Sequence, residues 1–453
     1  MGWIGWLCPG VNVKRWLFLA ACGICMCAMG LAMFFNFQIM GRLEELLFQF
    51  TYYVTGRYSN GMIMTIGVVL FLLGTVCLVI GTRKVVRSVL TSLMPGRSGS
   101  LMEKIFVQRK LTRGPAIAVI GGGTGLSTML RGMKYITNNV TAVVAMGDDG
   151  GSSGRLRKEL GIVPPGDLRN CMTALADQEP MMERLLQYRF KGDSPLAGHC
   201  FGNLLIAAMA EAEGGMEEGL KAASQILKVR GRVVPSTLED IQLQALMTDG
   251  TVVTGESHIS EAGKQIRRLR MLPENAAAAK DAVEAILKAD VLIFGPGSLY
   301  TSVIPNLVVG GIRDAILKSK AIKIYICNVM TQPGETDGYG AYEHVQALNE
   351  HMGADFLDYV IVNDEKISAA QLAPYREQGA KPVSPDTKKI SKAGINVVPA
   401  HLISETDLVR HDPVKLSRVL IGLIYRLRLF GKGVQFFDYF FVRMGLSRMK
   451  LKK

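Results

Sequence analysis

Short, unbroken apolar runs recur along the middle of the chain, and helical patterns separate them. The runs are AIAVI (116–120), TAVVAM (141–146), VLIFG (291–295), IKIYICNV (322–329) and YVIVN (359–363). A strand that is apolar throughout has to be covered on both faces, and Ala- and Leu-rich helical stretches such as 276–289 supply that cover. These runs predict an α/β fold with a mostly parallel sheet and helices on both faces. Residues 231–260 add a small β-rich insertion.

The first of these runs leads into a glycine loop. Gly121, Gly122, Gly123, Thr124 and Gly125 follow it directly and open a helical pattern. Glycines allow a tight turn and a close backbone approach to phosphate, while a helix N-terminus offers free N–H groups and the positive end of its dipole. Leu126 stands where a dinucleotide fingerprint requires a third glycine, and no Lys-Ser/Thr pair closes a Walker loop. The loop therefore predicts a phosphate site of another type.

A second polar loop follows the next apolar run and reads DDGGSSGR. A dehydrogenase places one acid at this point to bind a ribose hydroxyl. Here Asp148 and Asp149 stand together, so they are candidates for binding Mg²⁺ or ribose. Ser152, Ser153 and Arg155 are candidate phosphate ligands, with Arg155 able to bind in a bidentate manner. A plain surface turn is the alternative.

Further polar stretches stand at expected strand ends or helix starts, where the ligands of open α/β sheets bind. Their candidate binding residues are Asp167, Asn170, Asn203, Gly295, Gly297, Ser298, Tyr300 and Asn328. His199 and Asp148 are the two candidate catalytic residues, with His199 as a possible acid/base group. For His199, the alternative is a structural histidine whose hydrogen bonds are satisfied within the protein. Tyr300 has core packing as its alternative. Because parallel strands end at one edge of the sheet, we expect these loops to converge.

Two charge-free apolar stretches, about 16–35 and 61–80, precede the α/β region. Each is long enough to cross a hydrocarbon layer about 30 Å thick as a helix. Lys14 and Arg15 precede the first stretch, and Arg83, Lys84 and Arg87 follow the second, so both outer flanks are expected in the cytoplasm. We therefore expect residues 1–90 to form a membrane anchor with two transmembrane helices, which makes the chain a multi-pass protein of the cell membrane.

The charge is concentrated at the two ends of the 453-residue chain. The net charge is +8 over residues 1–112 and +9 over residues 413–453, which leaves −4 for the middle. A mildly acidic middle argues against nucleic-acid binding, and basic ends suit anionic lipid headgroups. Residues 91–114 are expected to be a basic linker, 115–412 the cytoplasmic domain and 413–453 a basic amphipathic segment. A final core helix is the alternative for the first half of that last segment.

Six ordered motifs between residues 115 and 412 resemble the CofD/YvcK family: GGGTGLS, DDGGSSGRLRKEL, PPGDLRN, GHCFGNLL, GPGSLYTSVIPNL and NVMTQPGETDGY. The resemblance implies a Rossmann-like domain with its nucleotide site on the quoted loops. It places the nucleotide loop at Gly121–Gly125 and a metal or substrate position at Asp148 and Asp149. It also implies that Asn203, Gly297, Ser298 and Tyr300 line the base and sugar-diphosphate pocket.

The family has two branches with different functions. CofD proteins transfer a phospholactyl group from a guanosine diphosphate conjugate to a deazaflavin with Mg²⁺. YvcK-type gluconeogenesis factors bind UDP-sugars, notably UDP-N-acetylglucosamine, and support cell shape and cell-wall synthesis, without an established reaction. The extended DDGGSSGRLRKEL and the GETDGY segment look like the YvcK branch. The usual YvcK pattern is soluble, and this sequence departs from it through its two apolar stretches and its basic tail. The resemblance and these stretches together favour a membrane-tethered UDP-sugar-binding regulator, expected to be a homo-oligomer, with cell-wall synthesis or regulatory proteins as partners. A 2-phospho-L-lactate transferase is the alternative.

Overall fold

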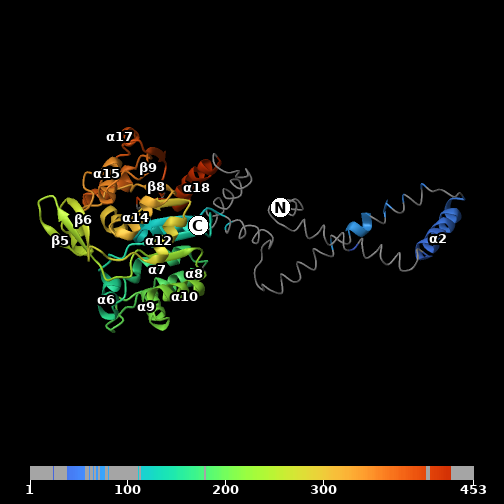
Figure 1. Cartoon of the computed structure of the whole chain (residues 1–453), viewed down its shortest axis with the longest axis horizontal. Helices are drawn as coiled ribbons and strands as arrows, with labels where there is room; N and C mark the ends of the chain where they lie inside the picture. The colour runs from blue at the N-terminus through green and yellow to red at the C-terminus, as the bar shows by residue number, and fades with distance from the viewer. Residues whose placement is uncertain are drawn as a thin grey trace. The chain divides into compact units, whose positions relative to one another are not determined.

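The computed structural model describes residues 38–56, 114–177, 180–404 and 409–429, together with scattered positions 24, 61, 65, 68–69, 72–76, 80 and 111. The chain divides into two units, residues 1–109 and residues 110–453. The second unit carries the α/β domain (Figure 1). Each unit is described by itself.

The α/β domain is built on a seven-stranded sheet in which every neighbouring pair is parallel. Its strands, in spatial order, are β10 (Asn396–Ala400), β9 (Tyr359–Asn363), β8 (Ile322–Ile326), β7 (Val291–Phe294), β1 (Ile117–Gly121), β2 (Val140–Val144) and β3 (Arg232–Pro235). The mostly parallel α/β sheet expected from the sequence is therefore confirmed. The two edge strands, β3 and β10, were not among the expected strands. Their burial is partial and their apolar runs are short or broken by proline.

Helices connect the strands of this sheet. They are α5 (Gly123–Met133), α6 (Gly151–Leu160), α7 (Pro165–Leu175), α8 (Pro180–Leu186), α9 (Phe201–Ala212), α10 (Met216–Ile226), α12 (Lys280–Lys288), the π-helical turn η2 (Leu299–Val303), α13 (Ile304–Leu307), α14 (Gly310–Lys318), α15 (Ala341–Met352), α16 (Ala369–Glu377) and α17 (Thr387–Lys392). The connections from β1 and from β7 run in opposite directions along the sheet. Because parallel crossovers are right-handed, their helices lie on opposite faces.

The β-rich insertion is a separate antiparallel sheet in the order β5-β4-β6 (Figure 1). It consists of β4 (Gln242–Met247), β5 (Val252–Thr254) and β6 (Ile266–Leu272), with α11 (Glu256–Glu261) between the last two. The expected insertion over 231–260 thus begins too early, since Arg232–Pro235 pairs with β2 of the main sheet. It also ends too early, because β6 lies beyond residue 260.

The C-terminal helix α18 (Pro413–Leu429) packs into the core of the domain. Leu416 and Leu420 are fully buried, and an added Cβ at Gly132 of α5 would meet Ser417 Oγ at 1.8 Å. This close approach shows that α18 lies directly on α5. Of the two alternatives for residues after Asp412, the core helix is therefore the one that forms, and the domain continues beyond Asp412. Residues 430–453 lie outside the described residues.

In the first unit, the structure describes one long helix, α2 (Gln38–Thr55). Its side chains include the exposed residues Leu46, Phe50, Tyr53 and Val54, and Tyr53 is 90% exposed. Among the described residues, no helix has the length and apolar character needed to cross a membrane. The expected spans at 16–35 and 61–80 fall largely outside the described residues.

Candidate functional site

The order of the strands reverses between β1 and β7, which are neighbours in the centre of the sheet. Chain connections leave these two strands in opposite directions, and the two loops separate at the carboxyl ends of the strands. In open α/β sheets, ligands bind in the crevice at such a switch point. The glycine loop after β1 and the loop after β7 both lie at this point in the present fold.

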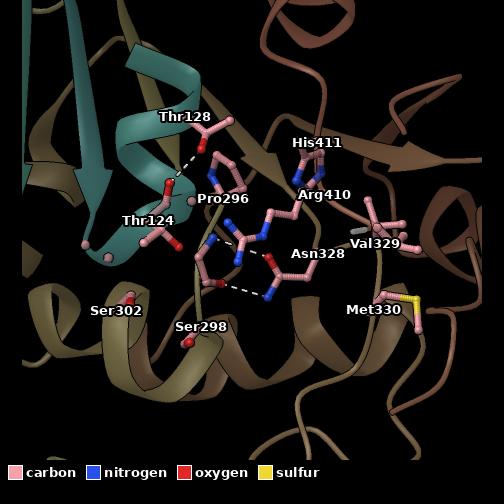
Figure 2. A pocket seen from close by; sticks show the side chains of 15 residues that line it. Thr124, Thr128, Pro296, Ser298, Ser302, Asn328, Val329, Met330, Arg410 and His411 are labelled. Atoms are coloured by element: carbon pink, nitrogen blue, oxygen red, sulfur yellow. Dashed lines mark hydrogen bonds between the residues drawn. The ribbon is translucent and has the colours of Figure 1, made fainter. Parts of the chain in front are cut away.

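A pocket of about 200 Å³ occupies this crevice (Figure 2). Four segments of the chain line it: the loop from β1 into α5, the loop after β7, the residues after β8, and the segment just before α18. The lining residues are Gly122, Gly123, Thr124, Gly125, Thr128, Pro296, Gly297, Ser298, Ser302, Asn328, Val329, Met330, Val409, Arg410 and His411. Seven of them belong to the binding residues expected from the sequence: Gly122, Gly123, Thr124, Gly125, Gly297, Ser298 and Asn328.

The glycine loop forms the N-terminal wall of the pocket because α5 begins there. Gly123 has a φ of +65°, a left-handed conformation that favours glycine. An added Cβ at Gly125 would lie 2.6 Å from the carbonyl oxygen of Pro296, so only glycine lets the two pocket loops approach this closely. The first turn of α5 therefore presents the N–H groups of Thr124 and Gly125 and its positive dipole end to the pocket, while the Gly123 N–H bonds to Asp167.

The loop after β7 is held in place by Asn328, which follows β8. The Asn328 side chain donates to Gly297 O at 2.8 Å and accepts from Gly297 N at 3.3 Å, as Figure 2 shows. On the opposite wall, Thr128 Oγ1 donates to Thr124 O at 2.8 Å. These contacts fix both loops before any ligand is present, which lowers the entropic cost of binding.

Arg410 is the cationic side chain among the described residues of the pocket lining. Figure 2 shows its guanidinium between the glycine loop and Asn328. None of the described residues that line the pocket is a carboxylate. His411 beside it is buried, and burial lowers its pKa to about 4, so the imidazole is neutral near pH 7. The pocket is thus positively charged and suited to an anion.

The pocket also has an apolar end formed by Val329, Met330 and Val409. All three are buried, and they belong to a small hydrophobic cluster apart from the main core. Figure 2 shows Val329 and Met330 on the opposite side of the pocket from Thr124, and Arg410 lies between these two sides. Polar backbone at one end and apolar side chains at the other suit a ligand with a phosphate group and a flat, less polar part.

Ser152, His199 and Asn203 form a second cluster, which does not line the pocket. Ser152 is buried, and its hydroxyl contacts His199 Nδ1 at 3.3 Å while accepting from Asn203 Nδ2 at 3.1 Å and Cys200 N at 3.2 Å. Burial, together with nearby arginines, lowers the pKa of His199. These partners identify Ser152 and His199 as groups that hold α6 to the start of α9.

Other residues expected to bind the ligand also contact the protein itself. Arg155 Nη2 donates to Ala197 O at 2.9 Å. Asn170 and Asn203 each accept from the guanidinium of Arg169 at 2.8 Å. An added Cβ at Gly166 would lie 2.4 Å from Ser153 Oγ, so Ser153 packs closely against the start of α7. In this structure these side chains stabilise the packing of α6, α7 and α9.

Asp167 connects this second cluster to the pocket. Its carboxylate accepts from Gly123 N at 2.5 Å, so it supports the glycine loop from outside the pocket lining. Burial raises the pKa of Asp167, and the nearby Asp148 raises it further, while the hydrogen bond from Gly123 opposes both effects. Asp167 therefore holds the loop in position.

The paired acids face the insertion rather than the pocket. Asp149 Oδ1 accepts from Ser257 Oγ at 2.5 Å and from Ser257 N at 3.1 Å, so it caps α11 from another loop. Asp148 Oδ1 accepts from Gly150 N at 3.0 Å. Among the described residues, no group of three or more His, Cys, Asp or Glu side chains is arranged to hold a metal ion. Because Mg²⁺ often needs only one or two protein carboxylates beside water and phosphate, its binding at Asp148 and Asp149 stays a prediction.

Glu256 is the first residue of α11 and lies close to these acids. Burial raises its pKa to about 8, and the negative charges of Asp148, Asp149 and Asp167 add to that effect. Sequence reasoning missed this residue because no motif marks it. Only the fold brings the insertion helix against the loop after β2.

Tyr300 lies in the core rather than in the pocket. Its side chain is 2% exposed, its hydroxyl is 3.0 Å from Tyr339 OH, and its ring makes edge contacts with Tyr339 and His351. Burial raises its pKa strongly. The structure therefore places Tyr300 in the core, as the core-packing alternative predicted. The π-helical turn η2 directs this residue towards α15.

Several pocket residues could not be found from motifs. Arg410 and His411 lie more than a hundred residues after the last β7 loop residue and have no glycine or strand pattern beside them. Thr128 lies inside α5, and Ser302, although part of the motif GPGSLYTSVIPNL, was not among the expected binding residues. The remaining expected residues, Gly121 and Gly295, end β1 and follow β7, where Gly295 has a φ of +76°.

Comparisons with known proteins agree with this architecture. Residues 117–403 match the family model described as 2-phospho-L-lactate transferase CofD. Among characterised sequences, a putative gluconeogenesis factor of Nostoc sp. is 44% identical over 425 residues, which are 92% of this chain and 92% of the relative. A putative gluconeogenesis factor of Clostridium acetobutylicum is 41% identical over 465 residues, and the aligned region spans 100% of this chain and 99% of the relative.

A solved structure supports the same conclusion for the α/β domain. The crystal structure of a Bacillus halodurans protein superposes with a TM-score of 0.67 at 47% sequence identity. The superposition covers 68% of this chain and 100% of the Bacillus halodurans chain. The Clostridium relative, in contrast, matches this chain along its whole length and so has a counterpart of the region before the domain.

Proposed function

The chain belongs to the CofD family, in the branch of the gluconeogenesis factors, and from this premise we propose that its switch-point pocket binds a UDP-sugar, with UDP-N-acetylglucosamine as the expected ligand. In this proposal the chain is a regulator that senses the ligand and acts on cell shape and cell-wall synthesis during growth on gluconeogenic carbon sources. The single observation that carries the binding proposal is the pairing of the α5 N-terminus with Arg410 across one pocket.

The chemistry of that pairing favours a diphosphate. The N–H groups of Thr124 and Gly125 in the first turn of α5 would bind phosphate oxygens through direct hydrogen bonds and the helix dipole, whereas the Gly123 N–H is already bonded to Asp167. Arg410 supplies a charge-assisted, bidentate donor opposite them. The described residues of the lining include no carboxylate, so Arg410 is the charged side chain that an anion meets there. The apolar end at Val329, Met330 and Val409 is suited to the base.

We further propose that the chain is tethered to the membrane by residues 1–90. Support comes from the two charge-free stretches at 16–35 and 61–80 and their basic outer flanks. Every described residue between 61 and 80 is helical, and the large apolar ones among them are about half exposed, from Val68 to Ile80. A membrane would cover such side chains. After an alkaline carbonate wash of cell membranes, the full-length chain is expected in the pellet, and its release into the supernatant would contradict the tether.

Calorimetric titration of the full-length chain in detergent tests the ligand. UDP-N-acetylglucosamine is expected to bind, and Arg410→Ala is expected to weaken it by about 10–100-fold, the effect of losing one charge-assisted contact. Arg267→Ala is the matched control, because Arg267 is exposed on β6 outside the pocket lining. Equal binding by the Arg410 and Arg267 variants would exclude this pocket as the site.

The alternative is a CofD-type 2-phospho-L-lactate transferase, which uses a nucleoside-diphosphate donor and Mg²⁺. It is supported by the description of the matching family model. Incubating the full-length chain with a phospholactyl-guanosine donor, a deazaflavin and Mg²⁺ distinguishes the two. Product formation, together with tight GDP binding and no binding of the UDP-sugar, would replace the proposed function by the alternative.

A further inference from the structure

His411 is held in a single tautomer by the end of β8. Its Nε2 atom lies 3.2 Å from the carbonyl oxygen of Cys327, and a carbonyl can only accept a hydrogen bond. The proton of the neutral ring is therefore on Nε2, and the ring stays neutral near pH 7 because burial lowers its pKa to about 4. Nδ1 is consequently a lone-pair acceptor.

His411 is largely buried, with 9% of its surface exposed. Its Nδ1 atom nevertheless has no hydrogen-bond partner among the residues that the structure describes. It is not among the buried polar atoms that are cut off from solvent, and His411 lines the pocket. Nδ1 is therefore open to the pocket. An acceptor that remains unpaired when a ligand excludes water costs about 1–3 kcal/mol, so this atom selects for a ligand that offers a donor.

The other polar side chains of the described lining differ from His411. The hydroxyls of Thr124, Thr128 and Ser302 can donate as well as accept. The amide of Asn328 already bonds to Gly297 through both its nitrogen and its oxygen. Ser298 Oγ donates to Gln332 Oε1 at 2.5 Å. The α5 N-terminus and Arg410 offer donors only. His411 is thus the side chain in this lining whose free atom accepts without being able to donate.

The place of His411 indicates which part of a ligand meets it. Val409 lies two residues before it, and Val329 lies two residues after Cys327, its hydrogen-bond partner. Val329, Met330 and Val409 belong to one apolar cluster in the lining, and Figure 2 shows Val329 and Met330 away from the glycine loop. A phosphate at the α5 N-terminus therefore leaves the base of a nucleotide, rather than its phosphates, beside His411.

We propose that His411 Nδ1 accepts a hydrogen bond from the imide N–H of a uracil base that lies against Val329, Met330 and Val409. The proposal rests on the proposed function, since it assumes that a uridine nucleotide occupies the pocket. It makes His411 the residue that reads the base, whereas the glycine loop and Arg410 hold the phosphates.

Calorimetric titration of the full-length chain with UDP, N3-methyl-UDP and 2′-deoxy-UDP tests this inference. Methylation removes the imide N–H, so the wild-type chain is expected to bind N3-methyl-UDP at least about tenfold more weakly than UDP. Binding of 2′-deoxy-UDP is expected to match that of UDP. Equal affinities for UDP and N3-methyl-UDP overturn the proposal, and so does a loss confined to 2′-deoxy-UDP, which would place a ribose hydroxyl at Nδ1.

Two variants separate the two nitrogens of His411. His411→Gln keeps an N–H donor in reach of Cys327 O and removes the Nδ1 acceptor, so it is expected to bind UDP and N3-methyl-UDP with nearly equal affinity. His411→Asn puts an amide oxygen near the Nδ1 position and is expected to regain part of the preference for UDP. A His411→Gln chain that retains the full preference contradicts the inference.

The outcomes also distinguish the inference from the function on which it rests. If the wild-type chain binds none of the three uridine nucleotides, the proposed function fails. If it binds UDP but ignores N3-methylation, the proposed function remains and only the role of His411 is rejected. The comparison of wild-type affinities requires no variant to fold.

Discussion

Replacing Gly125 with alanine tests the close approach of the two pocket loops. The added Cβ would lie 2.6 Å from Pro296 O, 2.9 Å from Pro296 C and 3.1 Å from the Cα of Gly297. All three neighbours are backbone atoms, so no side chain can rotate away. The closest contact is about 0.8 Å shorter than an ordinary van der Waals distance of about 3.4 Å, and the loop after β7 must move by a similar amount.

The expected cost follows from this overlap. Overpacking of this kind costs about 1–3 kcal/mol, and the better helix propensity of alanine at a position inside α5 returns up to about 1 kcal/mol. We expect the free energy of unfolding to fall by about 1–2 kcal/mol. Because the displaced loop carries Gly297 and Ser298, nucleotide affinity should fall about tenfold or more.

The assay compares thermal unfolding and calorimetric UDP-sugar binding of the full-length Gly125→Ala chain with those of Gly422→Ala. Gly422 lies inside α18, and an added Cβ there meets nothing within 4 Å. The control substitution should leave binding unchanged and stability equal or slightly higher. If Gly125→Ala retains both wild-type affinity and wild-type stability, the proposed contact between the two loops does not constrain the pocket.

Two other substitutions address residues near the site. Tyr300→Phe removes the hydroxyl that contacts Tyr339 OH at 3.0 Å. In urea denaturation this change should lower the free energy of unfolding by about 1 kcal/mol, and it should leave UDP-sugar affinity unchanged. A large loss of affinity would place Tyr300 in the ligand site. Glu256 keeps its proton in the folded chain up to a pKa of about 8, whereas the unfolded chain releases it near 4.5, so stability should fall as pH rises between these values. Glu256→Gln should flatten that dependence in urea denaturations at about pH 6 and about pH 8.5, and an unchanged slope would refute the assignment.

The central strands could be predicted because their apolar runs are unbroken. A run such as VLIF is buried on both faces, and only a central parallel strand or a buried helix explains that pattern. The edge strands β3 and β10 could not be predicted in the same way, since edge strands are partly exposed and Pro235 or Pro399 interrupts their apolar pattern.

The glycine loop could be predicted as a candidate phosphate site from the sequence, and the structure places it at the switch-point pocket. Three glycines between a strand and a helix have few other uses, and the missing third glycine of the dinucleotide pattern at Leu126 excluded the commonest rival. The convergence of the other polar loops was overestimated. The loop after β2 and the start of α9 meet each other through Ser152 and Asn203, while the pocket draws on the loops after β7 and β8.

The sequence by itself determined the local features of this protein: the strand-loop-helix unit at Gly121–Gly125, the class of the sheet, and the two charge-free stretches before the domain. These follow from residue patterns over five to twenty positions, where backbone geometry and burial act locally. Only the tertiary structure decided which distant side chains complete the site. Arg410 and His411 reach the pocket because α18 packs on α5 and carries the preceding segment back over β8, and no local pattern encodes such a long-range contact.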